Sequence, residues 1–160
     1  MKNGSLPTVA TLVLGTLGTL LLSGSTASAH TSDHPRDVPP VQCIENPAIP
    51  EGEISMIPLQ VGDKILELHC GVPGQYGTRY IHERHPISAE TQDMFAWCVA
   101  FAYGGPAAPG PVPNTTQHQW EYAPGKFAVS YYRNDTNLIV DAYTKGDGPQ
   151  ENNWVACAES

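Results

Sequence analysis

Side chains able to exchange a proton or bind an anion are concentrated in one short segment of the chain. Residues 77–85 read Gly-Thr-Arg-Tyr-Ile-His-Glu-Arg-His, so this segment carries two arginines, two histidines and a tyrosine. A histidine with a pKa near ~6.5 exchanges protons around neutral pH, and a guanidinium can hold a phosphate or a carboxylate through two parallel hydrogen bonds. The combination suits phosphodiester chemistry.

Other catalytic classes fit the chain less well. If the segment is helical, His82 and His85 lie on one face, but their spacing is one residue shorter than that of the zinc-protease histidines. No two cysteines have the close spacing of a zinc site, and no Gly-x-Ser-x-Gly sequence is present for a nucleophilic serine. We therefore expect neither a metal ion nor another cofactor.

The N-terminal region has the three parts of a secretory signal peptide. Lys2 precedes an apolar run over residues 9–22, and Ala27-Ser28-Ala29 supplies a small-residue cleavage site. The run is interrupted by glycine and threonine and is too short for a membrane-spanning helix. We predict a signal peptide over residues 1–29, no membrane anchor, and a secreted, extracellular protein.

The remaining chain divides into a leader and one domain. Residues 30–50 are rich in proline and aspartate, so we expect an extended, partly disordered leader. Residues 51–160 are of a suitable length for a single domain. The formal net charge is −8, and it would become −9 on loss of the signal peptide, which contains one lysine and no carboxylate. This charge disfavours a protein that coats polyanions but allows a local cationic pocket.

The four cysteines, an even number in an oxidising compartment, predict two disulfides. Three pairings are open. We favour Cys43 with Cys70, which would tie the proline-rich segment to the domain, and Cys98 with Cys157, which would tie the C-terminal tail to a helix.

Periodicity predicts an α+β fold, in which short helical segments pack on a small antiparallel β-meander. Ser88 can cap a helix whose apolar residues recur at three- and four-residue spacings from Met94 to Ala102. Gly104-Gly105 should end it, and residues 104–113 should form a flexible connection. Turn sequences and alternating apolar residues predict the strands. The expected strands are residues 54–57, 65–68, 119–122, 127–133 and 138–143.

The order of these features resembles the small ribonuclease toxin domains of the barnase, EndoU, colicin and RelE-like superfamily. The resemblance spans about residues 71–145 and includes Gly-x-Arg-x-Ile-x-x-Arg-His, an amphipathic helix, a Gly/Pro connection and a final strand before Ala-Tyr. The family usually has a histidine where Tyr80 stands and a hydroxyl residue where Asp141 stands. The matching residues are Gly77, Arg79, Ile81, Arg84, His85 and residues 139–144.

The resemblance implies a toxin-like, bacterial extracellular hydrolase that cleaves RNA without a metal, by attack of the 2′-hydroxyl on the adjacent phosphorus. It assigns His85 as general base or acid and the two arginines as clamps on the charged phosphorane. Tyrosine and threonine hydroxyls would support them, and a second histidine stands near the tyrosine. The candidate site residues are Arg79, Tyr80, His82, Arg84, His85, Tyr143 and Thr144.

Two alternatives remain open from the residues alone. A disulfide-bonded sheet with an acidic surface also suits a non-catalytic binding or inhibitory module, and the absent histidine at Tyr80 also suits an inactive member of the ribonuclease-like group. Trp120 and Tyr122 could stack a base, although packing on the sheet is the expected role. We expect a monomer whose partner is RNA, or a protein if it is a binding module.

Overall fold

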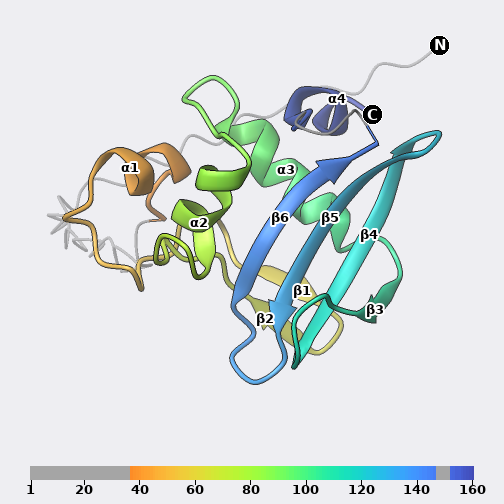
Figure 1. The fold of residues 1–160 in the computed structure, drawn as a ribbon, viewed down its shortest axis with the longest axis horizontal. Coiled ribbons are helices and arrows are strands. Elements are labelled where there is room, and N and C mark those ends of the chain that lie inside the picture. The colour runs from red at the N-terminus through yellow and green to blue at the C-terminus, as the bar shows by residue number, and fades with distance from the viewer. Residues whose placement is uncertain (1–36, 147–151) are drawn as a thin grey trace, which may run out of the picture. The chain divides into compact units, whose positions relative to one another are not determined.

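The computed structural model describes residues 37–146 and 152–160 (Figure 1). The predicted signal peptide and the first part of the predicted leader lie outside these residues. The described residues have the predicted α+β fold. The helices are α1 (Pro40–Glu45), α2 (Gly77–Arg84), α3 (Gln92–Ala102) and α4 (Trp154–Ala158), and the strands are β1 (Leu59–Val61), β2 (Lys64–Leu66), β3 (Ala107–Pro109), β4 (Thr115–Ala123), β5 (Lys126–Arg133) and β6 (Ile139–Lys145).

The main sheet is an antiparallel meander with the strand order β3-β4-β5-β6. Gly125, between β4 and β5, and Asn137, between β5 and β6, have positive φ angles of 75° and 57°, which glycine and asparagine tolerate best. The predicted strands of the meander are confirmed with small changes of boundary. The flexible connection predicted over residues 104–113 is wrong in part, because β3 forms ladder pairs with β4.

One face of the sheet is covered by α3, which passes behind β6 and β5 in the view of Figure 1. Phe95, Val99 and Ala102 recur at helical spacing and are all buried in the core. Burial of a side chain such as that of Phe95 stabilises the fold by about 1.5–3 kcal/mol. The predicted cap at Ser88 is wrong. Instead, the Thr91 hydroxyl accepts the Ser88 N–H at 3.0 Å in a turn before the helix.

The small hairpin β1-β2 is displaced from its predicted position at residues 54–57 and 65–68. Its register pairs Leu59 with Leu66. The backbone groups of the next residue, Glu67, point away from β1. Its N–H donates to the Asn137 carbonyl at 3.2 Å, and its carbonyl accepts the Ile139 N–H at 2.9 Å. These bonds join the hairpin to the start of β6.

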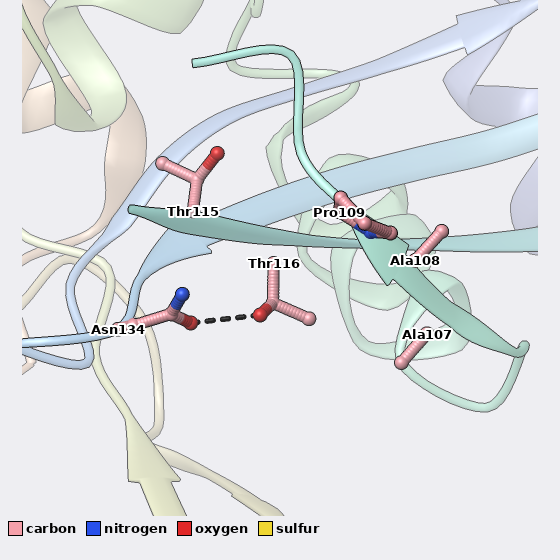
Figure 2. A pocket seen from close by; sticks show the side chains of 6 residues that line it. All are labelled: Ala107, Ala108, Pro109, Thr115, Thr116 and Asn134. Carbon is pink, nitrogen blue, oxygen red and sulfur yellow. Dashed lines mark hydrogen bonds between the residues drawn. The ribbon is translucent and has the colours of Figure 1, made fainter. Parts of the chain in front are cut away.

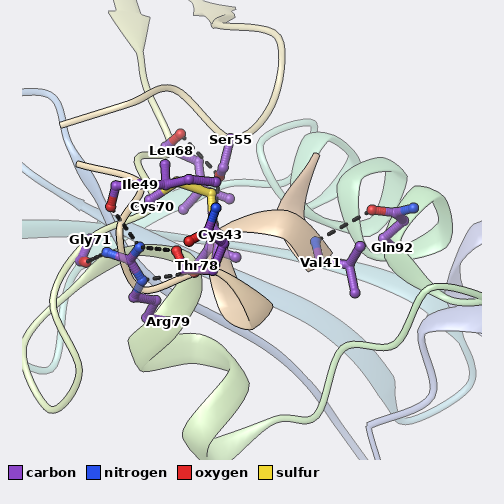
Figure 3. Close-up of a disulfide and its surroundings, with 11 residues drawn as sticks. Val41, Cys43, Ile49, Ser55, Leu68, Cys70, Gly71, Thr78, Arg79 and Gln92 are labelled. Carbon is purple, nitrogen blue, oxygen red and sulfur yellow. Dashed lines mark hydrogen bonds between the residues drawn. A yellow bond between two sulfur atoms is a disulfide. The ribbon is translucent and has the colours of Figure 1, made fainter. Parts of the chain in front are cut away.

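Both favoured disulfides are present, Cys43 with Cys70 and Cys98 with Cys157. The first holds α1 against the domain (Figure 3), so the prediction of an extended leader is wrong for residues 40–45. Pro40 occupies the first turn of α1, where its fixed φ angle favours a helix. The second disulfide ties α4 to α3. None of the helices in residues 37–146 and 152–160 is long and apolar enough to cross a membrane.

Candidate functional site

The chemistry-bearing segment of the sequence forms α2, which packs against β6. Gly77 starts the helix at a φ angle of +81°, and a Cβ atom there would lie 2.7 Å from the His69 carbonyl oxygen, so only glycine fits. Thr78 and Ile81 turn toward the core and are fully buried. The helix ends where Pro86 follows His85, because the residue before a proline disfavours helical geometry.

Arg79 lies apart from the other predicted site residues and holds the N-terminal part of the domain together (Figure 3). Its guanidinium donates to four backbone carbonyls, at distances of 2.8–3.2 Å. With its donors directed at the chain itself, Arg79 is occupied as a structural cross-link. The accepting residues are Cys43, Asn46, Ile49 and Gly71.

Arg84 lies one and a half turns further along α2 and has different partners. Its guanidinium donates to the Tyr80 hydroxyl and also lies over the Tyr80 ring, 5.4 Å from the centroid. One guanidinium nitrogen lies 3.7 Å from Oδ2 of Asp141, and the side chains of Arg84 and Asp141 are 53% and 2% exposed. Hydrogen bonding to Tyr80 is the main cause that raises the pKa of Arg84. A solvent-facing cation is therefore backed by a buried carboxylate.

Asp141 lies on β6 beneath Arg84. Its Oδ1 accepts the Ala142 N–H at 2.9 Å, and its Oδ2 accepts the Tyr131 hydroxyl at 3.4 Å. Burial raises the pKa of Asp141 to about 6, against the opposing charge of Arg84. Burial, followed by the charge of Asp141, also raises the pKa of Tyr131. At neutral pH this carboxylate is mostly ionised and can orient the guanidinium.

His85 stacks on Tyr143, with the ring centroids 5.3 Å apart and the planes inclined by 23°. The pKa of His85 is lowered to about 4, mainly by burial and in part by the charge of Arg84, while a hydrogen bond with Asn152 opposes both. Burial also raises the pKa of Tyr143. The imidazole is therefore neutral at pH 7 and able to accept a proton.

The other two predicted site residues have structural contacts elsewhere. Nδ1 of His82 accepts the Ile87 N–H at 3.1 Å and fixes the chain as it leaves α2. Thr144 is buried on the opposite face of β6 from Tyr143, where its hydroxyl accepts the Asn153 N–H at 2.8 Å. Neither side chain takes part in the contacts around Arg84.

Six side chains make up what we name the α2–β6 cluster. The sequence identified Tyr80 and Arg84 of α2, His85 at the end of this helix, and Tyr143. It gave no indication of Tyr131, and Asp141 was noted only as a departure from the residues usual in the ribonuclease family. The missing signal was the strand register, which pairs Tyr131 with Asp141 on the face that carries Tyr143. The members of the cluster are Tyr80, Arg84, His85, Tyr131, Asp141 and Tyr143.

Other features of the described residues lie away from the cluster. The ring centroids of Trp120 and Phe101 of α3 lie 5.1 Å apart, and Tyr122 belongs to the core on the same side of the sheet. Both side chains therefore have the packing role that was expected for them. No group of three or more histidine, cysteine or carboxylate side chains within residues 37–146 and 152–160 could hold a metal ion.

A shallow pocket lies at the far edge of the sheet, beside β3 (Figure 2). Its lining includes Thr116 and Asn134, which are joined by a 2.7 Å hydrogen bond, and small apolar residues of β3. It contains no titratable side chain, so it offers no acid–base chemistry.

Comparisons with protein-family models, curated protein sequences and solved structures found no match for this chain. The function is therefore argued from the α2–β6 cluster alone.

Proposed function

We propose that the domain is an exported, metal-independent ribonuclease that cleaves RNA by attack of the 2′-hydroxyl on the adjacent phosphorus. The observation that carries the proposal is a solvent-facing guanidinium that contacts a buried carboxylate and the Tyr80 hydroxyl, next in sequence to a neutral imidazole that stacks on Tyr143 of the same strand as the carboxylate. Two disulfides support export to an oxidising compartment. Only RNA offers the internal nucleophile that this chemistry requires.

Arg84 binds the scissile phosphate in this mechanism. Its side chain is 53% exposed, and the buried carboxylate of Asp141 fixes the direction of the guanidinium from below. The phosphorane formed on attack carries more negative charge near Arg84 than the starting diester does. A preorganised cation at that position stabilises the transition state more than the ground state. Asp141 acts here as a positioning residue.

His85 is the general base. The neutral imidazole accepts the proton of the 2′-hydroxyl as that oxygen forms its bond to phosphorus. The bond from phosphorus to the 5′-oxygen then breaks, and the Tyr80 hydroxyl gives its proton to the leaving oxygen. The guanidinium of Arg84, which is hydrogen-bonded to Tyr80, stabilises the resulting phenolate. Proton exchange with water restores both groups, and the first product carries a 2′,3′-cyclic phosphate.

The test is cleavage of a labelled single-stranded RNA by the oxidised chain in the presence of a chelator, with the DNA of the same sequence as a comparison. His85→Ala removes the base. His82→Asn is its control, because His82 lies on the same helix outside the cluster and Oδ1 of an asparagine can replace Nδ1 as acceptor of the Ile87 N–H. We expect cleavage of RNA alone, a drop of about 10²–10⁴-fold in His85→Ala, and near-normal cleavage by His82→Asn. Cleavage of DNA at the same rate, or no cleavage by the folded chain between pH 5 and 8, would overturn the proposal.

A non-catalytic binding module is the second candidate. It is favoured by Trp97 of α3, which is 60% exposed. The ring centroids of Trp97 and Phe101 lie 5.9 Å apart, and this row of aromatic rings continues to Trp120. Exposed aromatic side chains are enriched at binding surfaces. Absence of cleavage from a folded, oxidised chain would make this row the next site to examine.

A further inference from the structure

A second polar site lies on the sheet face that carries Asp141 and Tyr143. The strand register pairs Phe127 of β5 with Glu121 of β4 on one side and with Lys145 of β6 on the other. These three side chains form the next row of that face beyond Gln119, Val129 and Tyr143. The helix α3 packs on the opposite face, against Ala128 and Ala142.

Lys145 is held at this position by two contacts. Its ammonium donates to Oε1 of Gln119 at 2.5 Å, and it lies 5.1 Å from the centroid of the Phe127 ring. The Gln119 contact spans β5, because Gln119 lies on β4 and Lys145 on β6. A cation and the side-chain amide of Gln119 are thus held together above an aromatic ring.

The charge of this site is unusual for the protein. The chain has 8 lysine and arginine residues against 16 carboxylates, yet Arg84 and Lys145 both lie at the face that carries Tyr143. The carboxylate in the same row, Glu121, directs Oε1 at the Gly125 N–H in the turn at 2.8 Å. Asp141, the other carboxylate of this face, is 2% exposed and lies against Arg84. The two cations Arg84 and Lys145 therefore suit an anionic chain.

The separation from the α2–β6 cluster limits what could touch both places. Lys145 follows Asp141 by four residues on one strand, which corresponds to about 13 Å at the usual rise of a strand. The Lys145 ammonium is also held across β5 against Gln119, so we expect a phosphodiester bound by Arg84 not to contact it. A ligand that contacts both must carry a further phosphate along an extended backbone.

We propose that Lys145 and Gln119 form a second nucleotide subsite, which binds the phosphate of a neighbouring nucleotide in single-stranded RNA. The ammonium binds that phosphate, the Gln119 amide donates to it or to the adjacent base, and the Phe127 ring keeps the ammonium in place. This inference rests on the proposed ribonuclease function and makes the natural substrate an oligonucleotide.

The experiment compares a dinucleotide, which has one phosphodiester, with a single-stranded hexanucleotide as substrates of the oxidised chain. Lys145→Gln removes the charge. Lys64→Gln is the matched control, because the Lys64 ammonium also donates to a side-chain amide, that of Asn137 at 3.2 Å, and lies 5.6 Å from the Tyr132 ring. We expect Lys145→Gln to lower kcat/KM about tenfold on the hexanucleotide, as for loss of a hydrogen bond to a charged group, and to leave the dinucleotide unaffected. The slope of log(kcat/KM) against log[salt] should become less steep by about 0.7.

Two outcomes separate this subsite from the function on which it rests. Equal effects of Lys145→Gln on both substrates, or the same loss in Lys64→Gln, would overturn the subsite while the ribonuclease proposal stands. Failure of the unaltered chain to cleave either substrate would overturn the ribonuclease proposal instead. In that case the affinity for the labelled hexanucleotide, measured by fluorescence anisotropy, tests whether the subsite binds RNA. Unchanged affinity in Lys145→Gln would reject the subsite.

Discussion

The two arginines of α2 have different partners and different roles. Arg79, near the start of α2, gives its donors to backbone carbonyls of the chain around α1. Arg84, at the end of α2, faces a phenol and a buried carboxylate and is 53% exposed. The partners therefore distinguish a structural cation from a candidate ligand-binding cation, and the residue type does not.

The difference follows from what each end of α2 is packed against. The start of the helix adjoins α1 and the turn that follows it, where backbone carbonyls accept the donors of Arg79. The end of the helix adjoins β6, where Arg84 lies over the buried side chain of Asp141. Side chains of the sheet face, and not its backbone, are therefore what Arg84 meets.

The largest loss of stability is expected for Arg79→Gln. Loss of charge-assisted hydrogen bonds to four carbonyls should lower the free energy of unfolding by about 4 kcal/mol. Urea denaturation monitored by tryptophan fluorescence measures it. Any RNA cleavage per folded molecule should be unchanged. A loss of cleavage without a loss of stability would place Arg79 in the site and erase the distinction.

A similar but somewhat smaller loss is expected from the paired change Cys43→Ser and Cys70→Ser. This disulfide closes a loop with a sequence separation of 27 residues, so its removal should cost about 3–4 kcal/mol by the chain-entropy relation. Denaturation of the variant beside the oxidised chain provides the value. Hydrogen exchange should increase first in α1, and an increase confined to β6 would contradict the assigned role.

Arg84→Gln should reverse the pattern seen for Arg79→Gln. The guanidinium is mostly exposed, but its loss leaves the buried carboxylate of Asp141 without a counter-charge, so the unfolding free energy should fall by about 1–3 kcal/mol, less than for Arg79→Gln. Cleavage of RNA should fall about 10²–10³-fold, as for loss of a transition-state donor. Initial rates at saturating and limiting RNA test this expectation. Arg84→Lys keeps the charge and loses the planar fork, so it should recover only part of the rate.

Asp141→Asn tests the carboxylate behind Arg84 through pH. Burial raises the pKa of Asp141 from 3.8 to about 6, so the folded state favours the protonated form. This contribution to stability is full below pH 3.8 and is lost as the pH rises through 6. Relative to the unaltered chain, the variant should therefore be more stable at pH 7 than at pH 3.5 by roughly 2–3 kcal/mol. Urea denaturation at the two pH values measures the difference, and a pH-independent difference would contradict it.

His85→Gln should have the opposite sign and a smaller size. Burial lowers the pKa of His85 from 6.5 to about 4, so stability from the neutral imidazole is full above 6.5 and is lost as the pH falls through 4. The side chain is only half-buried, and solvent screening reduces the effect to about 1–2 kcal/mol. Thermal melting curves between pH 4 and 7 should converge for the variant and the unaltered chain as the pH falls. A constant gap between them would reject the shifted pKa.

Much of the fold could be predicted from the sequence because its signals are local. The apolar spacing of α3 and the turns around Gly125 and Asn137 predicted the helix and the meander. Both disulfides also followed from the elements that the cysteines tie together. The helix α1 could not be predicted, because a six-residue helix beside prolines forms only where tertiary contacts hold it, here the disulfide of Cys43.

The candidate site was predicted only as far as one segment allows. Residues 77–85 supplied Tyr80, Arg84 and His85, but the role of Arg79 depends on contacts with distant backbone and that of His82 on the path of the chain after α2. Asp141 illustrates the other limit. Its position beneath Arg84 depends on the register of β6 against β5 and on the packing of α2 beside β6, which no local pattern records.

The order of the disulfides along the chain has a consequence for biosynthesis. Each cysteine bonds with the next one in the sequence, Cys43 with Cys70 and Cys98 with Cys157, so the two covalent loops follow each other without overlapping. If the thiols are oxidised in the order in which they are synthesised, the first two to meet already form a native pair. We expect such a chain to fold with little reshuffling of its bonds, and α2, which lies between the loops, belongs to neither.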